Sequence, residues 1–247
     1  MDHYTMDTYG QAFAPFFDLV NNDEQEVKAT VSLLREYAAG GSVLEAGVGT
    51  GRIAVPLAQT GADVYGIEIS EKMAEQLQAK AAGHLVRLKV GDMASFRFDA
   101  PFSLVYITQG ALHSLLSLDQ QTACMKNLAI QLKDDGHLII ESLTLDRSRF
   151  VRDQYLDISM MDVGYVALSA AVHEPERQVV NQQSIFISQD GVQLFPLRYR
   201  YYSSDELDSM AAKAGLSLID RWSDWEKNPP HEKQTRFLSV YAKSRKE

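Results

Sequence analysis

The sequence predicts an α/β fold, with a mostly parallel β-sheet covered by helices on both faces and an antiparallel β-sheet inserted into it. Strand-like and helix-like segments alternate between residues 42 and 143, which is typical of parallel sheets, because each crossover between parallel strands needs a helix. Three runs of alternating apolar and polar residues follow, separated by the turn-like segments HEPE and QDG. The length of 247 residues suits one such domain with an insertion, or two small domains.

The first helix is predicted to follow an N-terminal segment rich in aromatic residues. Asp23 and Glu26 are spaced as in a capping box, and Gly40 and Gly41 end the helical pattern. Ser70 is the expected N-cap of a later helix. In the parallel part we expect helices over 51–61, 70–83 and 118–136, the last ended by Gly136, and strands over 42–48, 63–69, 85–92, 102–109 and 137–143.

The second half of the chain predicts the inserted sheet and the end of the main one. In the run VQLFPLRYRYY, Arg198, Arg200 and Tyr202 are expected on one face, with Tyr199 and Tyr201 on the other, because side chains alternate along a strand. We interpret this run as a half-exposed edge or dimer-forming strand whose other face is a candidate pocket lining. The inserted runs are VGYVALSAAVH, RQVVNQQSIFIS and VQLFPLRYRYY, and a helix over 204–215 and strands over 216–222 and 236–243 follow them.

Composition and charge argue against several classes of protein. The formal net charge of −9 disfavours a nucleic-acid partner, since such partners usually bind a basic face. The sequence shows neither a basic segment followed by a long apolar one at its N-terminus nor a membrane-spanning apolar run, so we expect a cytoplasmic protein without a membrane partner. The single cysteine, Cys124, is expected to be a small buried side chain on a helix.

The stretch VLEAGVGTGRIAVPLA, residues 43–58, places a glycine-rich turn between a strand and a helix. Gly47, Gly49 and Gly51 give G-x-G-x-G, whereas a dinucleotide fingerprint requires a glycine at the position of Arg52. A phosphate-binding P-loop requires a lysine after its last glycine, and none follows here. Both phosphate-binding interpretations are therefore weak, although the glycines still allow a ligand to approach the backbone closely.

The segment EAGVGTGR after an apolar strand resembles motif I of the class I S-adenosylmethionine-dependent methyltransferases. Two acids agree with this resemblance: Glu68 ends the second strand, 17 residues after Gly51, and Asp92 ends the third. The resemblance implies S-adenosylmethionine as cofactor and S-adenosylhomocysteine as product. It also implies that Glu68 accepts both ribose hydroxyls and that Asp92 accepts from the adenine amino group. The implied cofactor-binding residues are Tyr9, Glu45, Gly47, Gly49, Gly51, Arg52, Glu68, Ile69, Asp92, Met93 and Gln109.

The same resemblance implies a Rossmann-like sheet of seven strands, the last of them antiparallel. We divide the expected single domain into an N-terminal lid and helix (1–40), a cofactor-binding core (41–143), inserted strands that form a cap or a dimer surface (144–203), and a C-terminal helix with the last two strands (204–247). The insertion resembles that of bacterial small-molecule methyltransferases, including the amino-sugar N-methyltransferases of antibiotic pathways. A homodimer through the inserted strands is a further expectation.

Candidate catalytic and substrate-binding residues come from two segments. His113 follows the fourth strand, at the sheet edge where ligands of parallel α/β proteins bind. It is a candidate proton acceptor, substrate-binding residue or purely structural histidine. Tyr9 is a candidate catalytic lid residue close to cofactor and substrate. Phe13 and Phe17 are candidates for the substrate wall or for helix packing, and His173 is expected to have a solvated or packing role.

These features predict an enzyme that transfers a methyl group to nitrogen or oxygen of a small molecule, such as a specialised metabolite or an amino sugar. The segment TQGALHSL lacks the N/D-P-P-Y-type motif with which DNA and RNA amino-methyltransferases hold a flipped base. The sequence shows no pattern typical of a metal site, so no metal is expected. The alternatives are a fold member that binds S-adenosylmethionine but catalyses a non-methylating reaction such as cyclisation, and a non-catalytic binding protein.

Overall fold

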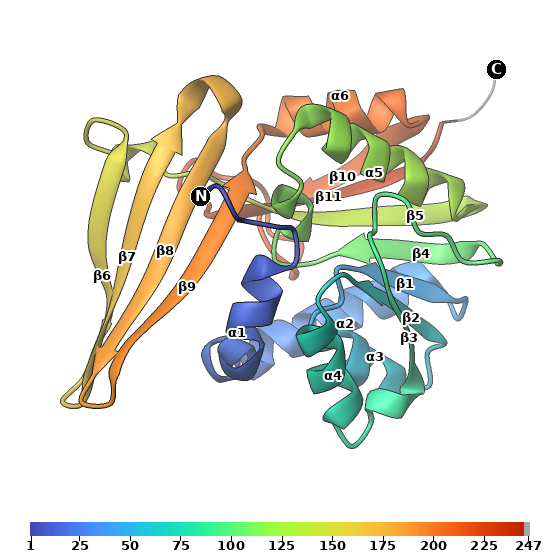
Figure 1. Ribbon diagram of the computed structural model, residues 1–247. Coiled ribbons are helices and arrows are strands. Elements are labelled where there is room, and N and C mark those ends of the chain that lie inside the picture. The colour runs from blue at the N-terminus through green and yellow to red at the C-terminus, as the bar shows by residue number, and fades with distance from the viewer. Residues whose placement is uncertain (245–247) are drawn as a thin grey trace.

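The computed structural model describes residues 1–244 and contains two β-sheets (Figure 1). The larger sheet has seven strands in the order β10-β11-β5-β4-β1-β2-β3. β11 pairs antiparallel with both β5 and β10, while β1 to β5 pair parallel with one another. This confirms the predicted Rossmann-like arrangement. The strands are β1 (Val43–Ala46), β2 (Val64–Glu68), β3 (Val86–Val90), β4 (Phe102–Ile107), β5 (Leu132–Leu143), β10 (Leu216–Trp222) and β11 (Arg236–Lys243).

Helices cover both faces of the larger sheet. On one face, Leu128 of α5 and Met210 of α6 belong to a cluster with Val105 of the sheet. On the other face, Leu34 of α2 packs in a second cluster with Tyr106. The α-helices are α1 (Thr8–Val20), α2 (Glu24–Ala38), α3 (Ala54–Gln59), α4 (Glu71–Ala79), α5 (Leu118–Ile130) and α6 (Ser204–Lys213), and short 3-10 helices are η1 (Gly83–Leu85), η2 (Ala111–Ser114), η3 (Arg147–Arg149) and η4 (Pro175–Arg177).

The predicted helix starts are confirmed. The Asp23 carboxylate accepts the backbone N–H groups of Gln25 and Glu26, and the Ser70 hydroxyl accepts the N–H of Met73. Such caps satisfy donors that the first turn of a helix leaves unpaired. Cys124 is fully buried on α5, as the sequence predicts.

The prediction of one helix over 118–136 is wrong. α5 ends before Gln131, and Leu132 already begins β5. The first residue of β4, Phe102, donates its N–H to the Gln131 carbonyl at 2.7 Å and pairs with Leu132. Gly136 lies inside β5, where a Cβ atom would come within 2.9 Å of the Phe102 carbonyl oxygen. Pairing with a distant strand therefore overrides the local helical pattern.

The inserted strands form a separate antiparallel sheet, which we call the cap (Figure 1). The sequence predicts three of its strands but not β6. That strand carries exposed apolar residues such as Leu156 and Ile158, and its pairing with β7 defines it. The cap strands are β6 (Gln154–Met161), β7 (Tyr165–Glu174), β8 (Val179–Ser188) and β9 (Gly191–Arg200).

Helix α1 lies between the cap and the core (Figure 1). Phe13 and Phe16 pack edge-on against Phe195 of β9, with ring centroids 5.2 and 5.1 Å apart. On its other side, Gly10 faces α4, where a Cβ atom would lie 2.5 Å from the Ser70 Cβ. The N-terminal helix therefore joins the cap to the core by packing on β9 and on α4.

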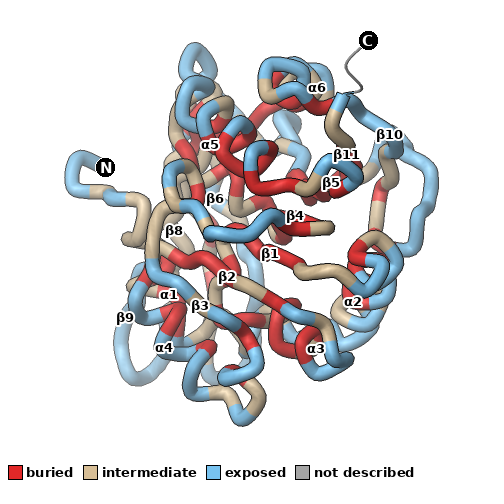
Figure 2. Tube along the Cα trace, turned by 90° about the vertical axis from the view of Figure 1, so that its right-hand side faces the viewer, coloured by how far each residue is buried: buried red, intermediate tan, exposed pale blue. Residues whose placement is uncertain are grey.

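The inner strands β1, β2, β4 and β11 of the larger sheet are mostly buried (Figure 2), whereas the edge strands β3 and β10 are largely exposed. All of β1, from Val43 to Ala46, is buried. β1, β2 and β4 are parallel and end at the same edge of the sheet, which is where open α/β sheets bind ligands. No helix within residues 1–244 is both long and apolar enough to cross a membrane.

Candidate active site

A cavity of about 750 Å³ lies at this edge of the larger sheet, and its walls come from the core, from α1 and from the cap. Ten of the eleven cofactor-binding residues that the sequence predicts line it, together with His113 and Phe17. The cavity thus brings together residues between Tyr9 and Gln109 that are far apart in the sequence. The ten residues are Tyr9, Glu45, Gly47, Gly49, Arg52, Glu68, Ile69, Asp92, Met93 and Gln109.

The turn after β1 has a conformation that favours glycine. Gly47 and Gly49 have φ angles of 78° and 55°, and a Cβ atom at Gly47 would lie 2.8 Å from the Ala111 Cβ. A Cβ atom at Gly49 would meet none of the described heavy atoms within 4 Å. Gly51 differs from expectation, because it faces Leu77 rather than the cavity, and a Cβ atom there would lie 2.8 Å from that side chain. Gly51 therefore serves helix packing beneath the turn.

Glu68, at the end of β2, is held against the glycine turn. Its Oε2 accepts the Gly49 N–H at 2.8 Å, and its Oε1 accepts the Ser70 N–H at 2.9 Å. Burial raises the pKa of this carboxyl group, and the backbone N–H groups oppose that rise. Each carboxylate oxygen has two lone pairs, so each oxygen keeps one for a hydroxyl group of a ligand.

Asp92 follows β3 and is fixed by the turn around it. Its Oδ1 accepts the N–H of Ala94 at 2.8 Å. The carbonyl of the next residue, Met93, accepts an amide N–H of Asn127 at 3.0 Å, and the Met93 side chain is buried in the main cluster. These contacts hold the Asp92 carboxylate and the Met93 backbone at the cavity wall.

Glu45 is buried where the cavity meets β1. It is 2% exposed, and its carboxyl oxygens accept the hydroxyl groups of Tyr106 and Thr108, both at 2.9 Å. Removal from water raises the pKa of Glu45 to about 7, although both hydrogen bonds and the charge of Arg52 act in the opposite direction. This carboxyl group is therefore partly protonated near neutral pH.

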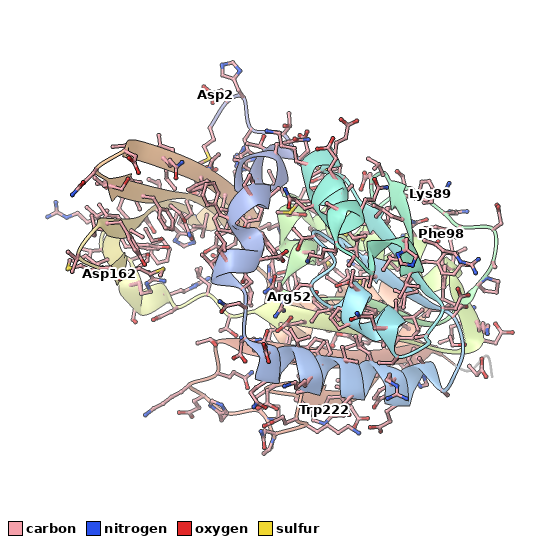
Figure 3. The ribbon with its side chains drawn as sticks, turned by 90° about the horizontal axis from the view of Figure 1, so that it is seen from below. Asp2, Arg52, Lys89, Phe98, Asp162 and Trp222 are labelled. Carbon is pink, nitrogen blue, oxygen red and sulfur yellow. The ribbon has the colours of Figure 1, made fainter. Side chains whose placement is uncertain are left out.

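An ion-paired chain of two arginines and two glutamates forms another wall. Arg52 lies 3.1 Å from Glu26 of α2, Arg236 lies 2.8 Å from both Glu26 and Glu141, and Glu141 accepts the Gln109 N–H at 2.6 Å. Figure 3 shows Arg52 beside α2, in the middle of the molecule. Gln109 has a φ of 49°, so the Glu141 carboxylate holds a turn whose backbone is strained.

The sequence does not assign Glu26, Glu141 or Arg236 to the site, although all three line the cavity. Glu26 was expected only as part of a helix cap. Glu141 interrupts the apolar strand HLIIESL, and a carboxylate inside a buried strand is itself a signal, because such a group needs a partner. That partner, Arg236, lies on β11, and the sequence does not show which strands are neighbours.

Helix α1 contributes Tyr9 and Phe17 to the cavity wall. Burial raises the pKa of the Tyr9 hydroxyl above its ordinary value. Phe13 does not line the cavity, is only 8% exposed, and packs among Tyr9, Phe17 and Phe195. Phe13 therefore does not form part of the substrate wall. It packs helix α1, which is the alternative that the sequence also allowed.

His113 has both ring nitrogens engaged. Nε2 accepts the Leu143 N–H at 3.1 Å, and Nδ1 donates to the Arg200 carbonyl at 2.8 Å. The imidazole stacks on Tyr202 with centroids 4.3 Å apart, and burial lowers the pKa of His113 to about 4. A histidine in this state has no free nitrogen for a substrate proton. The role of proton acceptor does not fit these contacts, whereas the structural alternative does.

Comparison with known proteins identifies the family. Residues 43–136 match the family model described as a methyltransferase domain. The solved structure of the CcbJ methyltransferase from Streptomyces caelestis matches 98% of this chain and 100% of its own, with a TM-score of 0.92 and 31% sequence identity. The chain belongs to the class I S-adenosylmethionine-dependent methyltransferases.

Two further relatives agree with this assignment. A putative methyltransferase of Geobacillus sp. (strain WCH70) is 24% identical over 94% of this chain and 99% of its own length. The amino pentose methyltransferase CalS10 from Micromonospora echinaspora, solved with S-adenosylmethionine bound, shares the fold. It matches 89% of this chain and 91% of its own, with a TM-score of 0.67 and 20% identity.

S-adenosylmethionine is the cofactor of this methyltransferase, and the site fits that molecule chemically. Gly49 leaves space beside its backbone, and the lone pairs that remain on Glu68 suit hydroxyl donors. S-adenosylmethionine carries no phosphate, which agrees with a turn that lacks the P-loop lysine. Among residues 1–244, no group of three or more His, Cys, Asp or Glu side chains is arranged to hold a metal ion.

The cap forms the opposite wall of the methyltransferase cavity with side chains that are both aromatic and polar. Tyr199 of β9 and Tyr201, which directly follows that strand, both line the cavity, as the alternation predicts. Arg200, on the other face, is not an exposed edge residue: it is 4% exposed and lies 2.6 Å from Glu206. The remaining lining residues from the cap strands are Tyr155, Gln182 and Leu197.

Proposed function

We propose that this methyltransferase transfers the methyl group to nitrogen or oxygen of a small specialised metabolite, with an amine of an amino-sugar-like molecule as the favoured acceptor. The observation that carries the proposal is that the cavity joins the predicted cofactor residues to the tyrosine-lined wall of the cap. A cavity of about 750 Å³ with a mainly apolar and aromatic lining suits small molecules. The hydroxyl groups of Tyr155, Tyr199 and Tyr201 are suited to a polyhydroxylated acceptor.

The state of His113 favours an amine over an alcohol. A neutral amine carries a nucleophilic lone pair, whereas an alcohol gains more from a strong base in the transition state. His113 does not supply that base, because Leu143 and Arg200 occupy both of its nitrogens. The likeness in fold to an amino pentose methyltransferase and to the sugar N-methyltransferase KedS8 from Streptoalloteichus supports the same acceptor class.

In the proposed mechanism, the residues of the chain bind the cofactor and the acceptor, orient them, and exclude water. The bound cofactor supplies an electrophilic methyl group on a sulfonium ion. Glu68 would accept the ribose hydroxyls, Asp92 and Met93 would hold the adenine, and Glu45 and Arg52 would hold the amino-acid end. Tyr9 and Phe17 of α1 keep water from the reacting atoms, and the Tyr9 ring also favours the positive sulfonium. Alignment of this kind supplies roughly 7–11 kcal/mol of barrier reduction.

A matched acceptor panel tests the proposal. The enzyme is incubated with S-adenosylmethionine and pairs of sugars that differ only by an amino or a hydroxyl group at one carbon, and S-adenosylhomocysteine and the methylated product are both quantified. With an amino sugar we expect equal amounts of S-adenosylhomocysteine and methylated product. With the matching hydroxyl sugar we expect at least tenfold less of both. Conversion of an acceptor without release of S-adenosylhomocysteine would instead indicate a non-methylating reaction such as cyclisation.

We also propose that two copies of the chain associate through the outer face of the cap. Residues in register across the four strands place apolar side chains on the face opposite to Tyr155 and Gln182. Their exposed fractions are high, for example 65% for Leu156 and 57% for Leu194. The set is Leu156, Ile158, Met161, Val172, Ile187, Val192 and Leu194.

A second copy suits this face because the seven positions are apolar and the neighbouring carboxylate of Glu174 is paired with Arg177 and Arg198, although the chain has a net charge of −9. Two like-charged copies therefore meet with little repulsion, and a two-fold axis pairs the same patch with itself. We expect Leu156→Lys to convert a dimer to a monomer in sedimentation analysis, and Ile130→Lys, an equally exposed site on α5, to leave it a dimer. A monomeric parent protein at about 50 μM would refute this contact.

A further inference from the structure

Three residues of the cap and its flanking segments form a hydrogen-bonded chain that ends at the cavity. Asp153 Oδ1 lies 3.1 Å from His173 Nδ1, and His173 Nε2 lies 2.9 Å from the Tyr201 hydroxyl. Tyr201 lines the cavity, whereas His173 does not line it and is 8% exposed. The Asp153 side chain is 56% exposed. The chain therefore leads from the cavity wall, through a buried imidazole, to a carboxylate in contact with solvent.

The chemistry of the three groups fixes the direction of these hydrogen bonds. An ionised carboxylate only accepts, so Nδ1 of His173 carries the proton and donates it to Asp153. Nε2 is then an acceptor, and the Tyr201 hydroxyl donates to it. The Tyr201 oxygen accepts an N–H of Arg147 at 3.1 Å, which leaves one of its lone pairs for a ligand. The same order of hydroxyl, imidazole and orienting carboxylate activates nucleophiles in other enzymes.

The turn that carries Asp153 is strained. Arg152 and Asp153 have φ angles of 53° and 60°, a left-handed conformation that is uncommon for two successive non-glycine residues. The His173 N–H donates to the Asp153 carbonyl at 2.8 Å, and Phe150 packs against the imidazole with centroids 5.1 Å apart. Strain of this kind persists where surrounding contacts fix it, often at functional sites. Here those contacts present the Asp153 carboxylate to His173.

We propose that Tyr201, His173 and Asp153 form a proton relay that deprotonates the acceptor nitrogen, an inference that rests on the proposed small-molecule acceptor. Tyr201 is the catalytic residue, and His173 and Asp153 act through it. Charged and titratable groups beside the relay include Arg147, Tyr155 and Tyr199, and the Arg149 guanidinium carbon lies 4.2 Å from the centroid of the Tyr155 ring. The Arg147 guanidinium carbon lies 5.4 Å from the centroid of the Tyr201 ring, and the two tyrosines belong to the same cluster. The positive charge of Arg147 favours the partial negative charge that develops on the Tyr201 oxygen.

The relay matters because an acceptor amine that enters as an ammonium ion has no free lone pair. Its proton moves to the Tyr201 oxygen while the Tyr201 proton moves to Nε2 of His173. Tyr201 stays neutral, and His173 becomes an imidazolium ion paired with Asp153. The freed lone pair then forms the C–N bond, and the electron pair of the broken C–S bond stays on sulfur. The products are a methylated ammonium ion and S-adenosylhomocysteine. After they leave, Tyr201 gives its proton to water in the cavity and takes back the Nε2 proton of His173, which restores the resting Nδ1–H tautomer.

The pH dependence of kcat/KM separates this relay from a structural role. With an amino-sugar acceptor near pH 7, we expect His173→Gln and Tyr201→Phe to lower kcat by about 10²-fold and to leave the KM for the cofactor unchanged, since a positioned base contributes ~10²–10⁴-fold. The deficit should shrink to less than about tenfold near pH 10, because the acceptor amine then loses its proton to water. A variant whose active site is merely distorted would show the same loss of kcat at every pH.

Two matched variants serve as controls. His137→Gln and Tyr37→Phe change the same residue types at positions that do not line the cavity, and we expect both to keep the parent pH profile. Loss of activity that does not depend on pH, or activity within twofold of the parent at pH 7, would overturn the relay while methylation by the parent still supports the proposed function. A parent enzyme that methylates no amine of the panel would refute the amine acceptor and the relay with it.

Discussion

Glu68→Ala removes the carboxylate that the structure holds against the glycine turn and that we propose binds the cofactor ribose. In the parent protein its two oxygens accept the N–H groups of Gly49 and Ser70, and each keeps a lone pair for a ligand hydroxyl, which we propose to be that of the ribose. Hydrogen bonds to a charged acceptor contribute about 1.5–3 kcal/mol each. Two such bonds, lost together and partly replaced by water, correspond to about 2–4 kcal/mol of binding free energy, or roughly 30- to 1,000-fold in Kd.

Calorimetric titration with S-adenosylmethionine and S-adenosylhomocysteine measures this change directly. Glu75→Ala, an exposed glutamate on the neighbouring α4, is the matched control and should bind as the parent does. Because Glu68→Ala also leaves the N–H groups of Gly49 and Ser70 without their acceptor, its folding is checked by thermal unfolding before titration. A change in Kd of less than twofold in a folded variant would contradict the assignment of Glu68 to the ribose.

Two further predictions concern stability as a function of pH, measured by chemical denaturation. The pKa of His113 is lowered from 6.5 to about 4 in the folded protein. Between these pH values the unfolded chain therefore binds more protons than the folded protein. The contribution of His113 to stability falls by about 2 kcal/mol from pH 6.5 to pH 5 for this reason. In His113→Asn this fall in stability should be absent. A slope of the unfolding free energy against pH equal to that of the parent protein would refute the lowered pKa of His113. The pKa of Glu45 is raised from 4.5 to about 7, so its contribution to stability increases as the pH falls from 7 to 4.5. Glu45→Gln should therefore steepen the loss of stability in acid, and a shallower loss would contradict the burial of its charge.

The helix caps and the strand-end acids could be predicted because their causes are local. Asp23 and Ser70 satisfy N–H groups within three residues of themselves, and Glu68 and Asp92 follow strands whose parallel ends meet at one edge. The end of α5 could not be predicted in this way, because the pairing of Leu132 with β4 decides it. The edge strand β6 was missed for the same reason, since its pairing with β7 defines it.

Among the candidate site residues, the role of His113 shows the limit of local reasoning. Its position after β4 is correctly predicted to face the cavity. Its chemistry depends on Leu143 and Arg200, which engage both nitrogens from two other segments of the chain. His173 was expected to have a solvated or packing role. The fold buries it, as the packing alternative predicts, and also places its two nitrogens within hydrogen-bond distance of Asp153 and Tyr201, which the sequence did not indicate.

By itself, the sequence determined the fold class, the family and the class of cofactor, because a glycine turn and two strand-end carboxylates encode them within short segments. Only the tertiary structure decided which ionisable side chains lie together at the active-site cavity. Glu26 and Arg236 form an ion pair across 210 positions of the chain, and Asp153, His173 and Tyr201 meet only when the cap folds. The physical reason is that protonation and hydrogen bonding depend on burial and on partners, and distant segments supply both.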